Sequence, residues 1–498
     1  MTITDQRSSR VASSSFTFTP AQLGGGRDKT QLIAYADRFG GSLAELSQLL
    51  RDDLDGVFDG VHILPFFTPF DGADAGFDPA DHTQVDERLG SWRDVKELSR
   101  THHVMADMIV NHVSHTNPAF RDVVENGEDS EYADMFLTFS AVFPDGASEE
   151  ELATIYRPRP GMPFTHYRWG DKTRLVWTTF TPQQIDINVA TGAGRQYLEN
   201  VLDALASGGV TQVRLDAVGY AVKTPGTSSF MTPQTYEFID SLAERARERG
   251  MSVLVEIHSH YENQVEVAKR VDQVYDFALP PLLLHAIHSD DIAPLTKWLE
   301  LRPLNAVTVL DTHDGIGIVD IGGDGAKPGL VTDEQLSALV ESIHDASDGA
   351  SRKATGWAAS NVDIYQVNCT FVDACGSSKA YALARAVQVF TPGVAQVYYA
   401  GLLGAHCDLE LLERTGVGRD INRPYFTAEQ VRARLRDELV ADQVELLRLR
   451  RTHPAFDGSC TITADPEAAS LAIEWRQGED VCTLTANFAE KSYAISHS

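Results

Sequence analysis

Eight short apolar runs recur along this chain of 498 residues, and stretches with the 3.6-residue period of a helix separate them. They cover residues 30–35, 60–67, 103–111, 213–220, 251–258, 273–279, 305–314 and 394–401. Strands that alternate with helices form a parallel sheet, and eight parallel strands close into a (β/α)8 barrel. The sequence therefore predicts an α/β protein built on a TIM barrel.

Three parts of the chain depart from this alternation. Two long segments interrupt it, and the end of the chain has the period-two pattern of an antiparallel sheet. The expected division is a catalytic barrel of residues 29–112, 188–314 and 379–455, an inserted B subdomain of 113–187, a second inserted subdomain of 315–378 and a C-terminal β domain of 456–498. Residues 1–28 begin with a polar stretch rich in Ser and Thr, and we expect a disordered leader there.

Composition argues against several classes of partner. Lys and Arg total 42 against 71 Asp and Glu, a formal net charge of −29 that repels nucleic acid and anionic membranes. No apolar run reaches the ~20 residues of a membrane helix, and the first residues lack the apolar core of a secretory signal. The five cysteines are an odd number without a CxxC pair, which favours reduced thiols. We therefore expect a cytoplasmic protein without a cofactor.

Polar residues gather at the carboxyl ends of the predicted strands, where the active sites of (β/α)8 barrels form. They are Asn111, His112, Asp216, Glu256, His258, His313 and Asp314. One strand also carries Arg214 on the same face as Asp216, although a strand in a parallel sheet is normally apolar throughout. This pair is either a structural ion pair or a carboxylate held ionised for chemistry, and the strand by itself leaves both interpretations open.

Three of these residues are carboxylates at the ends of three different strands, namely Asp216, Glu256 and Asp314. Cleavage of a glycosidic bond needs one carboxylate at the anomeric carbon and another that protonates the leaving oxygen. Arg214 favours the anion of Asp216, which suits a nucleophile. Glu256 follows an apolar run, and a dry environment would raise its pKa and suit a general acid. Asp314 would then stabilise the cationic transition state.

Four short segments resemble, in the same order along the chain, the four motifs of the α-amylase superfamily of glycoside hydrolases. They are residues 110–112 (Val-Asn-His), 214–217 (Arg-Leu-Asp-Ala), 256–258 (Glu-Ile-His) and 313–314 (His-Asp). The resemblance implies a retaining mechanism with a covalent glycosyl-enzyme intermediate. In that mechanism Asp216 is the nucleophile, Glu256 is the acid/base and Asp314 is the transition-state stabiliser.

Longer segments narrow the resemblance to the sucrose phosphorylase family within that superfamily. They are residues 62–78, 180–184, 274–281 and 418–423, and the similarity extends from about residue 30 to about residue 457. This resemblance implies a glycosyltransferase that carries out reversible phosphorolysis of sucrose to α-D-glucose 1-phosphate and D-fructose. Its partners would be these small molecules and inorganic phosphate, with no cofactor, and similar enzymes suggest a homodimer.

The resemblance also assigns contacts with the substrates. The glucose subsite would be formed by Asp74, Phe77, His112, His313 and Arg419. The acceptor side, where fructose leaves and phosphate enters, would be formed by Tyr156, Arg159, Asp363, Tyr365 and Gln366. Arg214, Tyr220 and His258 would line the same pocket. The residue types agree with this assignment, because sugar hydroxyls need polar partners, a sugar ring packs on an aromatic face and a phosphate needs an arginine.

Other functions would share most of these residues. A glucosylglycerol- or sucrose-6-phosphate-type phosphorylase would keep the glucose subsite and differ on the acceptor side. A hydrolase of the superfamily would use water on the same intermediate. A non-catalytic barrel would lack the carboxylates, whereas all three are present. His258 and His260 would offer two metal ligands on one strand face, but no third ligand is placed beside them, so no metal site is expected.

Overall fold

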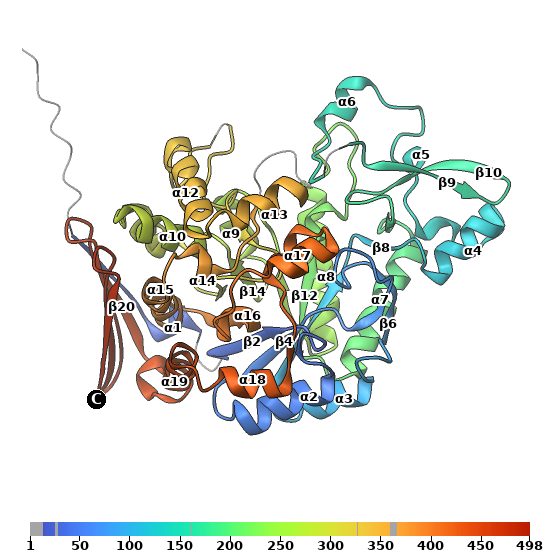
Figure 1. The fold of residues 1–498 in the computed structure, drawn as a ribbon. Coiled ribbons are helices and arrows are strands. Elements are labelled where there is room, and N and C mark those ends of the chain that lie inside the picture. Colours follow the sequence, from blue (N-terminus) through green and yellow to red (C-terminus); the bar gives the residue numbers. More distant parts are fainter. Residues whose placement is uncertain (1–12, 25–27, 160, 326, 359–365) are drawn as a thin grey trace, which may run out of the picture.

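The centre of the molecule is a closed barrel of eight parallel strands, seen in a computed structural model that describes residues 13–24, 28–159, 161–325, 327–358 and 366–498 (Figure 1). The strands are β2 (Thr30–Ala34), β4 (Gly60–Ile63), β7 (His103–Ile109), β12 (Gln212–Asp216), β13 (Ser252–Val255), β14 (Gln273–Asp276), β15 (Ala306–Thr308) and β18 (Val394–Tyr398). The barrel closes where β18 pairs with β2, with Ala395 opposite Thr30. The predicted TIM barrel is confirmed, and each of its eight strands lies within or beside a predicted run.

Several strands end earlier than their apolar runs predict. The run 305–314 predicts a long strand, whereas β15 covers only Ala306–Thr308. The run 213–220 likewise gives β12, which ends at Asp216, and a short 3₁₀ turn over Val218–Tyr220. The residues beyond the strands leave the hydrogen-bonded sheet because their side chains line the pocket at its carboxyl end.

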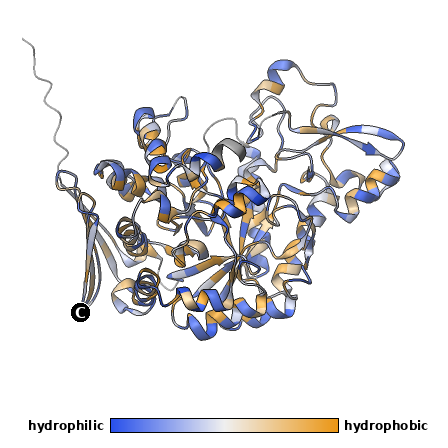
Figure 2. Ribbon diagram, viewed as in Figure 1, coloured by the Kyte–Doolittle hydropathy of each residue, from blue (hydrophilic) through white to orange (hydrophobic). Residues whose placement is uncertain are grey.

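Helices surround the barrel and turn their apolar sides toward it (Figure 2). They include α2 (Leu43–Gln48), α3 (Trp92–Leu98), α7 (Gly192–Ser207), α8 (Pro233–Glu248), α9 (Tyr261–Val267), α10 (Leu279–Ser289), α11 (Ala293–Leu301), α15 (Ser378–Phe390), α16 (Tyr399–Leu402), α18 (Ala428–Arg434) and α19 (Glu438–Thr452). In α7, Thr191 caps the first turn. Its buried large apolar residues recur with helical spacing at Leu198, Val201, Leu202 and Leu205.

The two interrupting segments carry short elements of their own. The first contains β8 (His112–Ser114), α4 (Pro118–Asn126), α5 (Phe139–Val142), α6 (Glu149–Thr154), β9 (Phe164–Trp169), β10 (Lys172–Trp177) and β11 (Gln184–Asp186). The second contains β16 (Ile316–Gly317), α12 (Asp333–Ala346), α13 (Ala350–Ala358), β17 (Gln366–Val367) and α14 (Phe371–Ala374). The first segment has a small core that includes Phe143, Ile155 and Trp177. No helix in the described parts of the chain is both long and apolar enough to cross a membrane.

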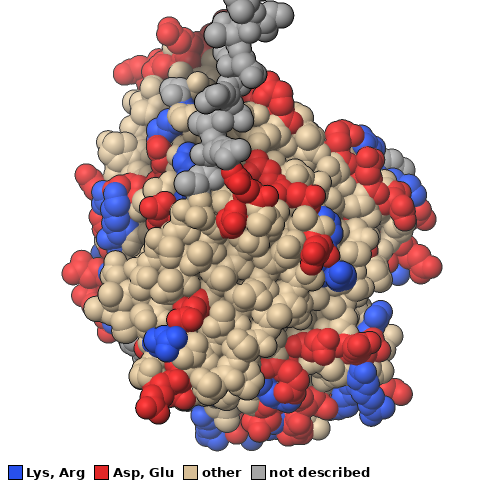
Figure 3. All heavy atoms as spheres, turned by 90° about the vertical axis from the view of Figure 1, so that its left-hand side faces the viewer, with Lys and Arg blue, Asp and Glu red and all other residues tan. Residues whose placement is uncertain are grey.

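A five-stranded antiparallel sheet contains the end of the chain and also part of its beginning. Its order is β1 (Ser14–Phe18), β20 (Ser459–Asp465), β21 (Ser470–Gln477), β22 (Asp480–Asn487) and β23 (Ser492–His497). The antiparallel sheet predicted at the C-terminus is therefore confirmed. Figure 3 views the molecule from the side of this sheet, and charged residues are sparse over the middle of that face.

The disordered leader expected over residues 1–28 is wrong for residues 14–23. Strand β1 pairs with β20, and a single helical turn, α1 (Pro20–Leu23), follows it. The half-buried Phe16 and Phe18 pack against the core, whereas the alternating residue Thr17 is exposed and hydrogen-bonds Thr461 at 2.9 Å. This alternation is the pattern of a half-buried strand, and the polar composition of the segment obscured it.

Candidate active site

A single pocket at the carboxyl ends of the barrel strands brings most of the predicted site residues together. It is lined by Asp74, Phe77, His112, Pro158, Arg159, Phe180, Asp216, Ala217, Gly219, Tyr220, Phe230, Glu256, Ile257, His258, His313, Asp314, Gln366 and Arg419. Asp363 and Tyr365 lie outside the described residues. Five aromatic or apolar lining residues were not predicted as site residues, namely Pro158, Phe180, Ala217, Phe230 and Ile257. Among these, Phe180 begins one of the segments that carry the family resemblance, which was a usable signal.

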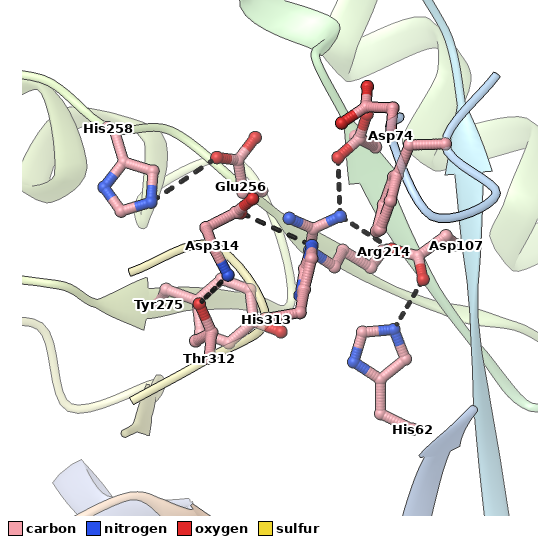
Figure 4. Close-up of polar contacts among 12 residues, drawn as sticks. His62, Asp74, Asp107, Arg214, Glu256, His258, Tyr275, Thr312, His313 and Asp314 are labelled. Carbon is pink, nitrogen blue, oxygen red and sulfur yellow. Dashed lines mark hydrogen bonds and ion pairs between the residues drawn. The ribbon is translucent and has the colours of Figure 1, made fainter. Parts of the chain in front are cut away.

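A chain of buried charged side chains leads from His62 through Asp107 to Arg214, which supports Asp216; Figure 4 shows the first three. Arg214 Nη1 donates to Asp216 Oδ1 at 2.6 Å and also to Asp107 Oδ1 at 2.6 Å. The other oxygen of Asp107 contacts His62 Nε2 at 2.9 Å. Although burial opposes ionisation, His62 and Arg214 lower the pKa of Asp107 to about 2, so this carboxylate is anionic. The sequence analysis missed Asp107 and His62, which anchor Arg214.

Asp216 itself has a raised pKa, in contrast to the low value expected from its arginine neighbour. Desolvation raises the pKa well above its usual range, Arg214 opposes this effect, and the carboxylate of Glu256 reinforces it. Arg214 compensates only in part because the same nitrogen also serves Asp107.

The turn after Asp216 aims this carboxyl into the pocket. Ala217 has a positive φ of 54°, which is rare for a residue with a side chain and costs backbone energy. It ends β12 and begins the 3₁₀ turn Val218–Tyr220, whose Gly219 and Tyr220 line the pocket. Strain of this kind at the end of a barrel strand is typical of functional sites.

Asp314 lies in a second charge cluster, with Arg419 and Asp74. Arg419 Nη1 is 2.9 Å from Asp314 Oδ1 and 3.4 Å from Asp74 Oδ1. Although Asp314 is buried, Arg419 and the neighbouring cations lower its pKa well below its usual range, so it is an anion. Gln184 Nε2 donates to the other oxygen of Asp74 at 2.7 Å. Arg419 and Gln184 therefore fix two carboxylates that both face a bound sugar.

An aromatic pair forms the floor of this part of the pocket. The rings of Phe77 and His313 stack at 4.5 Å with an angle of 5° between their planes. Burial lowers the pKa of His313 well below its usual range, so the ring is neutral. His112 Nε2 lies 2.9 Å from the carbonyl oxygen of Phe77, which orients the neighbouring imidazole. A flat apolar surface beside hydroxyl-binding carboxylates is the chemistry that a hexose needs.

His258 lies between Glu256 and the predicted acceptor side. Its Nδ1 is 3.0 Å from Asp320 Oδ2, and its Nε2 is 3.1 Å from Gln366 Nε2 and 3.7 Å from Glu256 Oε1. Burial lowers the pKa of this imidazole, but Asp320 outweighs burial and the pKa is raised. Asp320 was not predicted, because it follows its histidine partner by 62 residues.

Aromatic rings close the predicted acceptor side. Tyr220 lies 4.6 Å from Phe230, 5.0 Å from Phe180 and 6.1 Å from Tyr156, measured between ring centroids. Arg159 lines the pocket beside them and is half-buried, and desolvation lowers its pKa although a guanidinium remains charged. Tyr156 thus reaches the pocket through its stack on Tyr220, and not as a lining residue.

A buried lysine behind the site ties three segments together. Lys223 Nζ is 2.8 Å from Asp186 Oδ2 and 2.9 Å from Asn111 Oδ1, and it also donates to the carbonyl oxygen of Tyr220. The lysine and aspartate side chains are 2% and 0% exposed. Asp186 also accepts from the backbone N–H of Thr179 at 3.0 Å. The sequence analysis missed this network, which joins the turn after Asp216 to the base of the first inserted segment.

One set of side chains in the described residues has the spacing of metal ligands. Oxygen and nitrogen atoms of Glu256, His258 and Asp314 lie within 4.8 Å of one another. Two of these side chains have other partners, since Asp320 and Gln366 contact both nitrogens of His258 and Arg419 contacts Asp314. A cation at this position would compete with these contacts.

The fold and the three clustered carboxylates define a barrel enzyme of the kind that processes glycosidic bonds. The family model that matches is the α-amylase catalytic domain, over residues 53–301. The chain therefore belongs to the α-amylase family and, as its relatives below indicate, to its sucrose phosphorylase branch.

Relatives cover nearly the whole chain. It is 54% identical over 464 residues to the sucrose phosphorylase of Bifidobacterium adolescentis, with 92% of each chain covered. It is 53% identical to the sucrose phosphorylase of Agrobacterium vitis, covering 95% of this chain and 97% of that one. Among solved structures, the sucrose 6F-phosphate phosphorylase of Thermoanaerobacter thermosaccharolyticum superposes with a TM-score of 0.86 at 32% identity, covering 94% and 95% of the two chains.

Proposed function

We propose that this protein is a sucrose phosphorylase, a glycosyltransferase that converts sucrose and phosphate reversibly into α-D-glucose 1-phosphate and D-fructose. The observation that carries this proposal is the 54% identity with a sucrose phosphorylase over 92% of both chains. The pocket supports it, because it offers four carboxylates, an aromatic floor and two arginines, Arg159 and Arg419, within one cavity. Arg159 favours an anionic acceptor in a protein whose formal net charge is −29.

In the first step, Asp216 attacks the anomeric carbon of the glucosyl unit and Glu256 donates a proton to the glycosidic oxygen. The bond to fructose breaks, fructose leaves with that proton, and a covalent glucosyl-enzyme remains. This step uses Asp216 as an anion and Glu256 in its protonated form. Arg214 favours the anion of Asp216 through its 2.6 Å bond and so opposes the effect of burial.

In the second step, phosphate attacks the same carbon from the side that fructose left. The hydroxyl proton of the attacking phosphate oxygen passes to Glu256, and the bond to Asp216 breaks. Two displacements at one carbon retain the α configuration. Arg159 lines this side of the pocket and would attract the phosphate. Asp314, Asp74 and Arg419 would hold the glucosyl hydroxyls through both steps.

We also propose that the enzyme works in the cytoplasm as a homodimer. Five free cysteines fit a reducing compartment. The dimer rests on the family resemblance stated for the sequence.

The first test is a donor panel assayed for glucose 1-phosphate. With sucrose and phosphate, we expect equal amounts of fructose and glucose 1-phosphate, and little product from sucrose 6-phosphate or glucosylglycerol. Asp216→Asn and Glu256→Gln should each lower turnover by at least about 10³-fold, because each removes one of the two groups that the displacement needs.

Asp171→Asn is the matched control, because this exposed carboxylate lies on a hairpin turn and its loss should leave turnover unchanged. Free glucose released at the same rate with and without phosphate would instead identify a hydrolase. A clear preference for sucrose 6-phosphate or glucosylglycerol would identify the protein as one of the related phosphorylases instead. Near-normal activity of Asp216→Asn would refute the nucleophile assignment.

A further inference from the structure

Two of the five cysteines lie in contact with each other. Cys369 Sγ and Cys407 Sγ are 3.6 Å apart, although 38 positions separate the residues in sequence. Cys369 is fully buried, whereas Cys407 is half-buried. Sequence composition favoured reduced thiols, and the structure indeed contains five free cysteines. Composition could not show that two distant thiols meet.

The two segments around this contact are held in register by other bonds. The backbone N–H of Thr370 donates to Cys407 Sγ at 3.4 Å. In return, the backbone N–H of Cys407 donates to Asp373 Oδ2 at 2.7 Å. Thr370 and Asp373 belong to the start of α14, so the sulfurs face each other across a fixed junction. A disulfide here would need only a small movement of two side chains.

Both segments lead directly to the pocket. Cys369 follows β17, whose Gln366 contacts His258 in the pocket, and β17 pairs with β16 just after Asp314. Gly315 packs so closely on Val367 that an added Cβ would lie 3.0 Å from its carbonyl oxygen. Beyond Cys407, the chain forms α17 (Leu409–Thr415) and then the turn that carries Arg419. A bond between the sulfurs would thus join the two segments that deliver Gln366 and Arg419.

We propose that Cys369 and Cys407 form a redox modification site, which a peroxide converts into an intramolecular disulfide that slows turnover in the adjacent pocket. The part of this proposal that concerns turnover rests on the proposed function, whereas the formation of the disulfide does not.

The chemistry balances with one molecule of hydrogen peroxide. The Cys407 thiol loses its proton, its sulfur attacks one peroxide oxygen, and the O–O bond breaks, which gives a sulfenic acid and a hydroxide that takes up the thiol proton to form the first water. Cys369 sulfur then attacks the Cys407 sulfur, the S–O bond breaks and a second water forms. Two thiols are oxidised by two electrons and the peroxide is reduced to two waters. Cys407 reacts first because it is the more exposed thiol. The hydrogen bond with Cys407 and the burial of Cys369 together raise the pKa of Cys369 well above its usual range, so Cys369 is the less reactive thiol.

The disulfide would draw the sulfurs from 3.6 Å to about 2.05 Å. Displacements of about 1 Å in a catalytic pocket can cost up to about 100-fold in rate, and these cysteines are one segment removed from it. We therefore expect about a tenfold loss of phosphate-dependent turnover, reversed by dithiothreitol.

The test treats the purified full-length protein with hydrogen peroxide, blocks free thiols and measures intact mass, linked peptides and activity at matched times. We expect a loss of two hydrogens, a peptide that joins Cys369 to Cys407, and three free thiols out of five in the denatured protein. Turnover should fall with the same time course. Cys369→Ser and Cys407→Ser should form no such link and should keep their turnover under peroxide, whereas Cys375→Ser should behave like the wild type.

Oxidation of other cysteines, or formation of sulfinic acid without a disulfide, would refute the proposed modification site. A disulfide between Cys369 and Cys407 that leaves turnover unchanged would refute the proposed effect on the pocket. Protein that lacks phosphorolysis before oxidation would instead refute the proposed function, since the mass measurement does not depend on activity. If serine at the buried position 369 prevents folding, Cys407→Ala carries the same comparison.

Discussion

Asp78 is a buried carboxyl beside the glucose subsite that bears on stability. It is 4% exposed, and its Oδ1 makes no hydrogen bond within the described residues. The loop packs against it closely, because a Cβ added at Gly72 would lie 2.7 Å from Asp78 Oδ2. Burial, with help from nearby Asp74, raises the pKa of Asp78 from 3.8 to about 7. The folded protein therefore holds a proton here at a pH where an unfolded chain has lost it.

This proton makes stability depend on pH. Because the folded pKa is the higher one, Asp78 costs stability as the pH rises from about 4 to about 7, and the full cost above pH 7 is about 4 kcal/mol. Asp78→Asn keeps the size of the side chain and removes the titration. Relative to the wild type, the variant should therefore gain about 2 kcal/mol in free energy of unfolding between pH 5.5 and pH 8.

Urea unfolding at the two pH values measures this gain. Asp71→Asn is the control, because this carboxyl lies in the same loop but is exposed and paired with Arg88. A difference between Asp78→Asn and wild type that stays constant with pH would mean that Asp78 is ionised in the folded protein throughout this range.

Individual site residues were predictable where a local pattern marks them. Asp216, Glu256 and Asp314 each end an apolar run, so a charged side chain stands out there. Asp107 is likewise a charged residue within an apolar run. Its role could not be predicted, because it binds Arg214, which follows it by 107 positions. Asp320 and Lys223 lie in irregular segments outside the strands and helices of the barrel. Their burial, which gives them their importance, arises only when distant segments fold over them.

At the scale of elements, the buried pair of Lys223 and Asp186 connects the barrel to its first insertion. Removing one partner of a buried ion pair leaves the other charge uncompensated, which typically costs about 3–5 kcal/mol. Lys223→Met should lower the free energy of unfolding by that amount. The double variant with Asp186→Asn should be more stable than Lys223→Met alone, because the amide carries no stranded charge and its oxygen can still accept from Thr179.

Chemical unfolding of the wild type, both single variants and the double variant gives this comparison as a double-mutant cycle. Strictly additive effects of the two substitutions would show that the two side chains do not stabilise each other.

The elements themselves were largely predictable, and their ends were not. An apolar run indicates which residues are buried, and residues can remain buried after the last hydrogen bond that pairs a strand with its neighbour. For β15 the run extends six residues past the strand, from Thr308 to Asp314, because those residues are buried against the pocket. Strand β1 was missed for the opposite reason: its two phenylalanines lie among serines and threonines, so the segment was interpreted as a polar leader.

At the scale of the whole molecule, β1 joins the beginning of the chain to its end. It forms the outer strand of the C-terminal sheet, and all five of its residues pair with β20. Deleting residues 1–19 should leave β20 as an edge strand with unprotected amides. Hydrogen exchange of residues 460–464 should then quicken by about tenfold or more, whereas deletion of 1–12 should leave it unchanged.

Peptide-level exchange on both truncated proteins and the wild type makes this measurement. Equal protection of residues 460–464 in the two truncated proteins would contradict the pairing of β1 with β20.

The pairing of β1 with β20 also bears on the order of events during synthesis. Register pairs such as Ser14 with Ala464 join residues whose translation is separated by 450 positions. At about 5–20 residues per second, the ribosome needs roughly 20–90 s to supply that partner. Throughout this interval the first strand emerges with Phe16 and Phe18 uncovered and without a neighbour. This sheet can therefore form only late in translation, and a nascent chain that stalls anywhere before residue 459 offers an unpaired strand with two uncovered phenylalanines to chaperones and proteases.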